Sequence, residues 1–138
     1  MSLKSRGTNA ERELVHKFWA HGWACIRVAG SGSSRYASPD LLAGNARRKL
    51  AIECKLTTDS AKYFDKREIE QLQLFSRTFG AEAWVAIKMD HIWYFLNLED
   101  MKETPAGYVV SKSIAEMKGL SFEELIQYSV TTVEKLQN

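Results

Sequence analysis

The arrangement of apolar and polar residues in the segment 38–55 predicts a β-hairpin. Two short apolar runs, 41–44 and 50–54, flank a polar turn. Side chains along a strand point alternately to the two faces of its sheet. Glu53 and Lys55 are therefore expected on one face, and the apolar residues of the second run on the other.

The pairing of this hairpin places two acidic residues together. If the strands pair symmetrically about Ala46 and Arg47, Asp40 lies directly opposite Glu53. Opposed side chains are ~4.5–5.5 Å apart at Cβ, and like charges there destabilise a sheet. Mg²⁺ would explain the pair, because it takes one or two carboxylates together with waters and phosphate oxygens. With Lys55 beside them, this layout suits a metal-dependent phosphodiesterase. The alternative is a half-exposed hairpin whose charges face solvent.

The remaining periodicities predict three helices and four further strands. The helices are expected at 8–20, 66–79 and 121–128, and the strands at 23–29, 82–88, 91–96 and near 107–111. Segment 56–64 is expected to be a polar connection, and 129–138 a frayed tail. The strand at 91–96 is almost entirely apolar, so it is either buried on both faces or part of a subunit interface. A length of 138 residues suits one domain with a single core.

Glu11 has two interpretations. Thr8 and Glu11 have the spacing of a capping box, in which the glutamate bonds back to the cap amide. Residue spacing alone favours this helix-capping role. The alternative is that Glu11 points at the metal site as an extra carboxylate.

Two further segments each have a purely structural and a functional interpretation. The Gly/Ser-rich run 30–35 is either an idle linker or a flap that orders on DNA, with Ser31 and Arg35 available for phosphate. Lys66 and Arg67 fall in the first turn of a predicted helix, where the helix dipole favours acidic residues. They are either solvated cations or the binding site of an external phosphate.

Charge is unevenly divided although the net charge is only +2. Residues 1–55 contain 10 Lys/Arg and 4 Asp/Glu, whereas residues 56–138 contain 9 and 13. A basic half around a small acidic cluster suits a protein that holds a polyanion with its flanks and a metal with its centre.

The sequence gives little support for a disulfide, a zinc site, a nucleotide-binding site, or a membrane or secreted location. Cys25 and Cys54 lie in apolar runs and are expected to be reduced core residues. The three histidines form no ligand cluster, so zinc is not expected, and no phosphate-binding loop indicates a nucleotide cofactor. No apolar run approaches the ~20 residues of a membrane span, and no secretory signal is apparent. We therefore expect a cytoplasmic, nucleoid-associated protein.

Taken together, these motifs are similar to those of a known family. The chain resembles the archaeal-type Holliday-junction resolvases, the Hjc family, within the PD-(D/E)xK nuclease superfamily. The resemblance rests on the order and spacing of short segments, which are 7–14, 27–31, 39–41, 52–55, 66–67 and 75–80.

The resemblance implies a fold, an activity and a set of site residues. The expected fold is α/β, with a mixed central β-sheet flanked by helices and a restriction-endonuclease-like core, in a homodimer. The expected activity is Mg²⁺-dependent symmetric incision of four-way DNA junctions, with Mn²⁺ as a substitute. Asp40 and Glu53 would bind the metal together with the Cys54 backbone carbonyl, and Lys55 would orient water. Glu11 would be a further active-site and metal-binding member, which reverses the preference for its capping role.

The resemblance also implies how DNA is held. Ser31 would be a flap hydroxyl needed for cleavage. The DNA backbone would be contacted by Arg12, Arg27, Lys66 and Arg67, to which the flap interpretation above adds Arg35. Two alternatives stay open, a duplex-cutting repair or restriction-type nuclease on the same scaffold and a module that binds junctions without cutting them. Partner proteins from recombination are left open.

Overall fold

The centre of the protein is a five-stranded mixed β-sheet, seen in a computed structural model that describes residues 2–128. Its strand order is β1-β2-β3-β5-β6. These strands are β1 (Ala24–Arg27), β2 (Leu41–Gly44), β3 (Lys49–Thr57), β5 (Glu82–Met89) and β6 (Ile92–Asn97). Neighbours are antiparallel except for β3 and β5, which are parallel. The expected mixed central sheet is confirmed.

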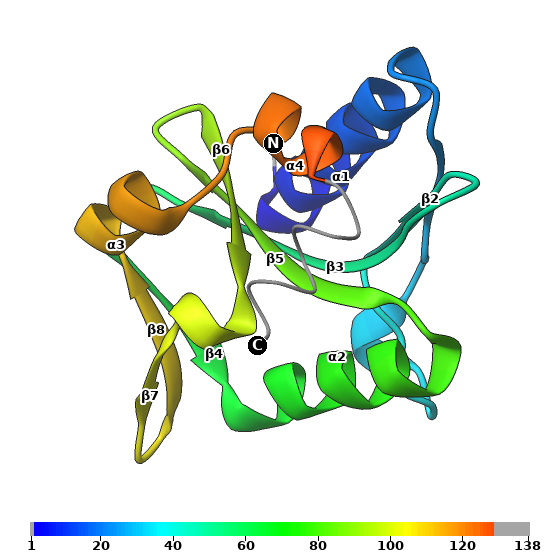
Figure 1. The fold of residues 1–138 in the computed structure, drawn as a ribbon. Coiled ribbons are helices and arrows are strands. Elements are labelled where there is room, and N and C mark those ends of the chain that lie inside the picture. Colours follow the sequence, from blue (N-terminus) through cyan, green and yellow to red (C-terminus); the bar gives the residue numbers. More distant parts are fainter. Residues whose placement is uncertain (1, 129–138) are drawn as a thin grey trace.

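Helices cover both faces of this sheet (Figure 1). One face packs against α1 (Leu3–Ala20) and α4 (Phe122–Gln127), and the other against α2 (Lys66–Phe79) and α3 (Lys112–Lys118). The first core joins Phe18 and Phe122 to Ile52, and the second joins Ile69 to Val85. Each helix contributes a periodic apolar stripe, which is why the sheet is buried on both sides.

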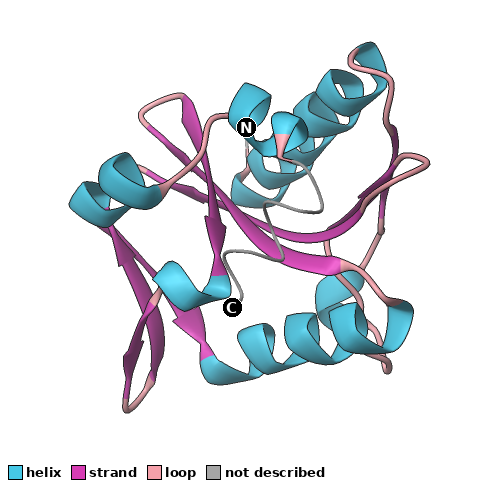
Figure 2. Ribbon diagram, viewed as in Figure 1, coloured by secondary structure: helices cyan, strands magenta, loops and turns pink. Residues whose placement is uncertain are grey.

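A small antiparallel sheet stands beside the main one (Figure 2). Its order is β4 (Ala61–Asp65), β8 (Gly107–Ser111) and β7 (Lys102–Thr104). The prediction of a polar connection over 56–64 is wrong, because β3 continues to Thr57 and β4 begins at Ala61. Phe64 is buried in the second core and anchors β4 there. β7 and α3 were not predicted, and two 3₁₀ turns occupy Ser31–Ser33 and Leu98–Asp100.

The hairpin β2–β3 has the predicted register. Gly44 pairs with Lys49, and Leu41 pairs with Ile52. The alternation of faces is also confirmed, because Ile52 lies in the first core and Ala51 in the second. Glu53 and Lys55, at the same phase as Ala51, therefore face α2.

The apolar strand β6 is buried on both faces. Trp93 and Phe95 lie in the first core, whereas Leu96 lies in the second. This confirms one of its two expected roles, and a subunit interface at this strand stays a prediction. Ile92, at its start, is 53% exposed.

The predicted helices are present with two corrections. α2 ends at the expected residue, before Gly80, which has the left-handed conformation that glycine adopts readily (φ 87°). The helical period places Phe79 on the inward face with Ile69 and Leu72, but Phe79 is 47% exposed. α1 begins at Leu3 with Ser2 as its N-cap. The capping box at Thr8 and Glu11 is therefore wrong, because the helix already includes both residues.

The final helix, expected at 121–128, is α4, and Ser121 and Glu124 form a capping box at its start. The frayed tail expected at 129–138 lies outside the described residues. None of the helices within 2–128 combines the length and apolar character needed to cross a bilayer.

Candidate active site

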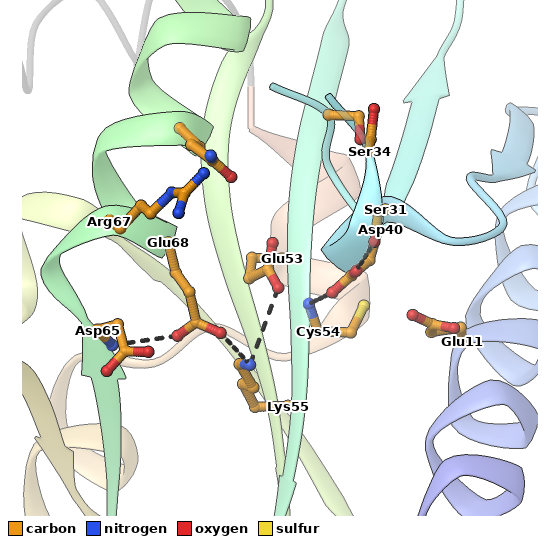
Figure 3. A pocket seen from close by; sticks show the side chains of 12 residues that line it. Glu11, Ser31, Ser34, Asp40, Glu53, Cys54, Lys55, Asp65, Arg67 and Glu68 are labelled. Carbon is orange, nitrogen blue, oxygen red and sulfur yellow. Dashed lines mark hydrogen bonds and ion pairs between the residues drawn. The ribbon is translucent and has the colours of Figure 1, made fainter. Parts of the chain in front are cut away.

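A polar pocket lies between the β2–β3 hairpin, α1 and α2 (Figure 3). It contains all five residues expected to be catalytic: Glu11, Ser31, Asp40, Glu53 and Lys55. The other residues that line it are Ser34, Ser38, Cys54, Asp65, Arg67, Glu68 and Gln71. Residues from four separate segments thus converge at the end of the hairpin: α1, the loop before β2, β3 and the start of α2.

Asp40 is fixed at the point where the ladder between β2 and β3 ends. Its backbone N–H donates to the Ile52 carbonyl at 3.0 Å. One carboxylate oxygen accepts the Ser31 hydroxyl at 2.6 Å, and the other accepts the Cys54 N–H at 2.8 Å. Pro39, directly before it, is buried. The Asp40 carboxylate is therefore held against β3, with Ser31 bound to it.

Strand β3 carries the acidic and basic members side by side. Glu53 and Lys55 project from it toward α2 (Figure 3). The Lys55 Nζ donates to Glu68 Oε1 at 2.6 Å and lies 4.0 Å from Glu53 Oε1. The Glu53 side chain is only 15% exposed, so a negative charge on it would be poorly solvated and poorly screened by water.

The surroundings of Glu53 hold a proton on its carboxyl group, which an incoming cation would have to displace. Burial, followed by the charge of Asp40, raises the pKa of Glu53 to about 9. Burial alone would lower the pKa of Lys55, but its hydrogen bond to Glu68 raises it overall. At neutral pH the Glu53 carboxyl therefore keeps its proton until a stronger positive charge displaces it.

The donor set fits a hard divalent cation. Within residues 2–128, no group of three His, Cys, Asp or Glu side chains is arranged to hold a metal by itself. Two neighbouring carboxylates nevertheless suffice for Mg²⁺, since waters and substrate phosphate oxygens complete its shell. Asp40 and Glu53 fit this requirement, and the backbone carbonyl of Cys54 lies next to them in β3.

Glu11 reaches the pocket from the middle of α1. Arg27 Nε donates to Glu11 Oε2 at 3.1 Å, and another guanidinium nitrogen reaches the Thr8 hydroxyl at 3.4 Å. Burial and the charge of Asp40 raise the pKa of Glu11, and Arg27 partly offsets this. Arg27, expected at the DNA backbone, thus contacts a pocket carboxylate, and its DNA contact stays a prediction.

The other expected DNA-binding residues are spread around the pocket. Arg67 lines it, whereas Arg12 and Lys66 are exposed outside its lining. Arg35 is exposed, with its guanidinium 5.7 Å from the centre of the Tyr36 ring. Their roles on DNA stay predictions.

Glu68 is the main pocket residue that sequence reasoning missed. Asp65 and Glu68 have capping-box spacing, and the Asp65 N–H donates to Glu68 Oε2 at 3.1 Å. The spacing of Asp65 and Glu68 in the sequence indicates only a helix cap. The contact with Lys55 depends on how α2 crosses β3, which the spacing does not reveal.

Comparisons with known proteins agree with this geometry. A sequence model of the archaeal Holliday junction resolvase (hjc) family matches residues 2–133. The crossover junction endodeoxyribonuclease Hjc of Archaeoglobus fulgidus is 42% identical over 130 residues, which are 88% of this chain and 96% of that protein. The Hjc of Methanocaldococcus jannaschii is 33% identical over 121 residues, covering 88% of this chain and 86% of that protein.

A solved structure shows the same fold. The crystal structure of Archaeoglobus fulgidus Hjc, a Holliday junction resolvase, matches with a TM-score of 0.80 and 39% identity, covering 86% of this chain and 96% of that one. Family, relatives and fold therefore point the same way, and the chain belongs to the archaeal Holliday junction resolvase family, Hjc.

Proposed function

We propose that this protein is a metal-dependent endonuclease that resolves four-way DNA junctions by paired, symmetric incisions. The observation that carries the proposal is the placement of Asp40, Glu53 and Lys55 in one pocket. Opposed carboxylates destabilise a sheet unless a bound proton or a cation offsets their repulsion, and a metal ion would take the place of the proton on Glu53. The resolvase names of the relatives supply the substrate class.

In this mechanism Asp40, Glu53 and the Cys54 carbonyl would hold Mg²⁺, with Mn²⁺ as a substitute. The metal would stabilise the attacking and leaving oxygens of an in-line displacement at phosphorus. Lys55 orients the attacking water or the phosphate, and Ser31 steadies Asp40 through the hydrogen bond it already makes. The expected products carry a 5′-phosphate and a 3′-hydroxyl.

DNA is held by the basic surroundings of the pocket. Arg67 lines the pocket and would bind the scissile phosphate, while Arg12, Arg35 and Lys66 would contact the flanking backbone. Each chain carries one carboxylate set, so two incisions call for a homodimer whose two-fold axis matches that of the junction. Junction shape, not base sequence, would then set selectivity.

Two alternatives remain distinct from this proposal. A duplex-cutting nuclease would share every pocket residue and differ only in substrate preference. A binding module without cleavage would have no use for opposed carboxylates, and it would not need a divalent metal.

The proposal predicts that cleavage needs Mg²⁺ and that less Mg²⁺ suffices as the pH rises. Protein treated with EDTA leaves a labelled junction intact, and Mg²⁺ restores incision. Because Glu53, with a pKa of about 9, must lose its proton to bind the ion, affinity should rise from about pH 6 to about pH 9. The half-saturating Mg²⁺ concentration of cleavage at several pH values measures this.

Calorimetry in two buffers of different ionisation enthalpy provides the control, because about one proton should be released per ion at neutral pH.

The same pKa shift also makes the free energy of unfolding of the metal-free protein depend on pH. The contribution of Glu53 to the free energy of unfolding is full below the unfolded pKa of 4.5 and is lost as pH rises through about 9. Cleavage that continues in excess EDTA would overturn the proposal.

A further inference from the structure

Glu68 connects the start of α2 to the lysine of the pocket (Figure 3). Its Oε1 accepts the Lys55 ammonium at 2.6 Å, and its Oε2 accepts the Asp65 backbone N–H at 3.1 Å. The same ammonium is 4.0 Å from Glu53 Oε1. Lys55 therefore donates its hydrogen bond to Glu68 of α2, although Glu53 lies two residues away on the same strand.

The helix cap alone does not account for this arrangement. A capping glutamate needs one oxygen for the cap amide, and Glu68 uses its second oxygen on Lys55. The Glu68 and Lys55 side chains are 32% and 24% exposed, so water screens their attraction less than at the open surface. The contact is thus a specific charge-assisted hydrogen bond.

Releasing Lys55 would alter the carboxylate beside it. A lysine ammonium is a compact charge on a flexible four-carbon stem. Freed from Glu68, it lies close enough to move onto Glu53 with a change of rotamer. An ammonium on Glu53 would take the place of its proton and compete with a divalent cation for the same oxygens.

We propose that Glu68 is a positioning residue, which holds Lys55 away from Glu53 and so keeps the Glu53 carboxylate available for a metal ion. The inference rests on the proposed function, since it assigns a task to Glu68 within the same site. Glu68 acts through Lys55 and needs no contact with the substrate.

The variant Glu68→Gln tests this with little disturbance of the helix. Its amide oxygen can still accept the Asp65 N–H, but it carries no charge to hold Lys55. We expect the affinity for Mn²⁺ without DNA, followed by the loss of the free-ion electron paramagnetic resonance signal, to fall about tenfold. Mn²⁺ is a suitable probe because it takes the same oxygen ligands as Mg²⁺.

Two other properties of Glu68→Gln, its junction binding in EDTA and its melting temperature, should change little. Glu70→Gln, on the exposed side of the same helix, is the matched control and should keep the parent affinity.

A double-mutant cycle separates positioning from simple loss of negative charge. In a Lys55→Met background no ammonium can move onto Glu53, so Glu68→Gln should no longer weaken Mn²⁺ binding. An equal loss in both backgrounds, or no loss in the parent, would overturn the inference. The Mn²⁺ measurements decide this point even if the parent chain shows no metal-dependent cleavage, a result that would instead overturn the proposed function.

Discussion

Asp40→Asn is expected to reduce junction cleavage by about 10³-fold, because one of the two carboxylates for the metal is lost and a metal in such a site supplies several kcal/mol of transition-state stabilisation. The fold should survive. The asparagine oxygen can accept the Cys54 N–H, and its amide can donate to the Ser31 hydroxyl, which replaces both hydrogen bonds of Asp40. Single-turnover cleavage of a labelled junction measures the loss.

Binding to the junction should persist in Asp40→Asn, because phosphate contacts dominate the affinity for DNA. Removal of a carboxylate that faces phosphate can even tighten it. Asp59→Asn is the matched control, since Asp59 is exposed and lies outside the pocket lining. A loss of binding as large as the loss of cleavage would show that Asp40 has a structural role and would contradict the metal assignment.

Arg48→Met is expected to lower the free energy of unfolding by about 3–5 kcal/mol, the usual cost of breaking a buried ion pair. Arg48 is 5% exposed. Its guanidinium bonds both Glu82 carboxylate oxygens at 2.8 and 2.9 Å and the Leu125 carbonyl at 2.6 Å. The substitution leaves Glu82 without its cation and the end of α4 without its donor. Urea denaturation measures the change.

The neighbouring turn residue supplies the control for this prediction. Arg47 is exposed, and Arg47→Met should change stability by no more than about 0.5 kcal/mol. Adding Glu82→Met to Arg48→Met should recover part of the loss, because the unpaired carboxylate is removed. If Arg48→Met were as stable as Arg47→Met, the guanidinium would not join α4 to the sheet as described.

The centre of the site was predictable because it depends on local periodicity. The alternation along 50–55 places Glu53 and Lys55 on one face, and the register of the hairpin follows from its short turn. The pairing of Leu41 with Ile52 confirms the register, and the placement of Ile52 and Ala51 in opposite cores confirms the alternation. To predict such features, only the two-residue period of a strand and the length of the connecting loop have to be known.

The periphery of the site was not predictable in the same way, because it depends on how distant elements pack. The spacing of Thr8 and Glu11 indicated a helix cap, yet α1 starts at Leu3 and presents Glu11 to the pocket. The partner of Lys55 is Glu68 on another element, and the anchor of α4 is Arg48 in the hairpin turn. Strand β4 was missed because its one buried aromatic residue, Phe64, follows a polar stretch.

Junction resolution is tested most directly by comparing cleavage of a four-way junction with cleavage of a linear duplex of the same sequence, in Mg²⁺. We expect paired nicks at symmetric positions of the junction and no incision of the duplex. Equal cutting of both substrates would show that the protein is a nuclease but would contradict selective resolution of junctions. Tight junction binding without any cutting would contradict the catalytic assignment of Asp40, Glu53 and Lys55.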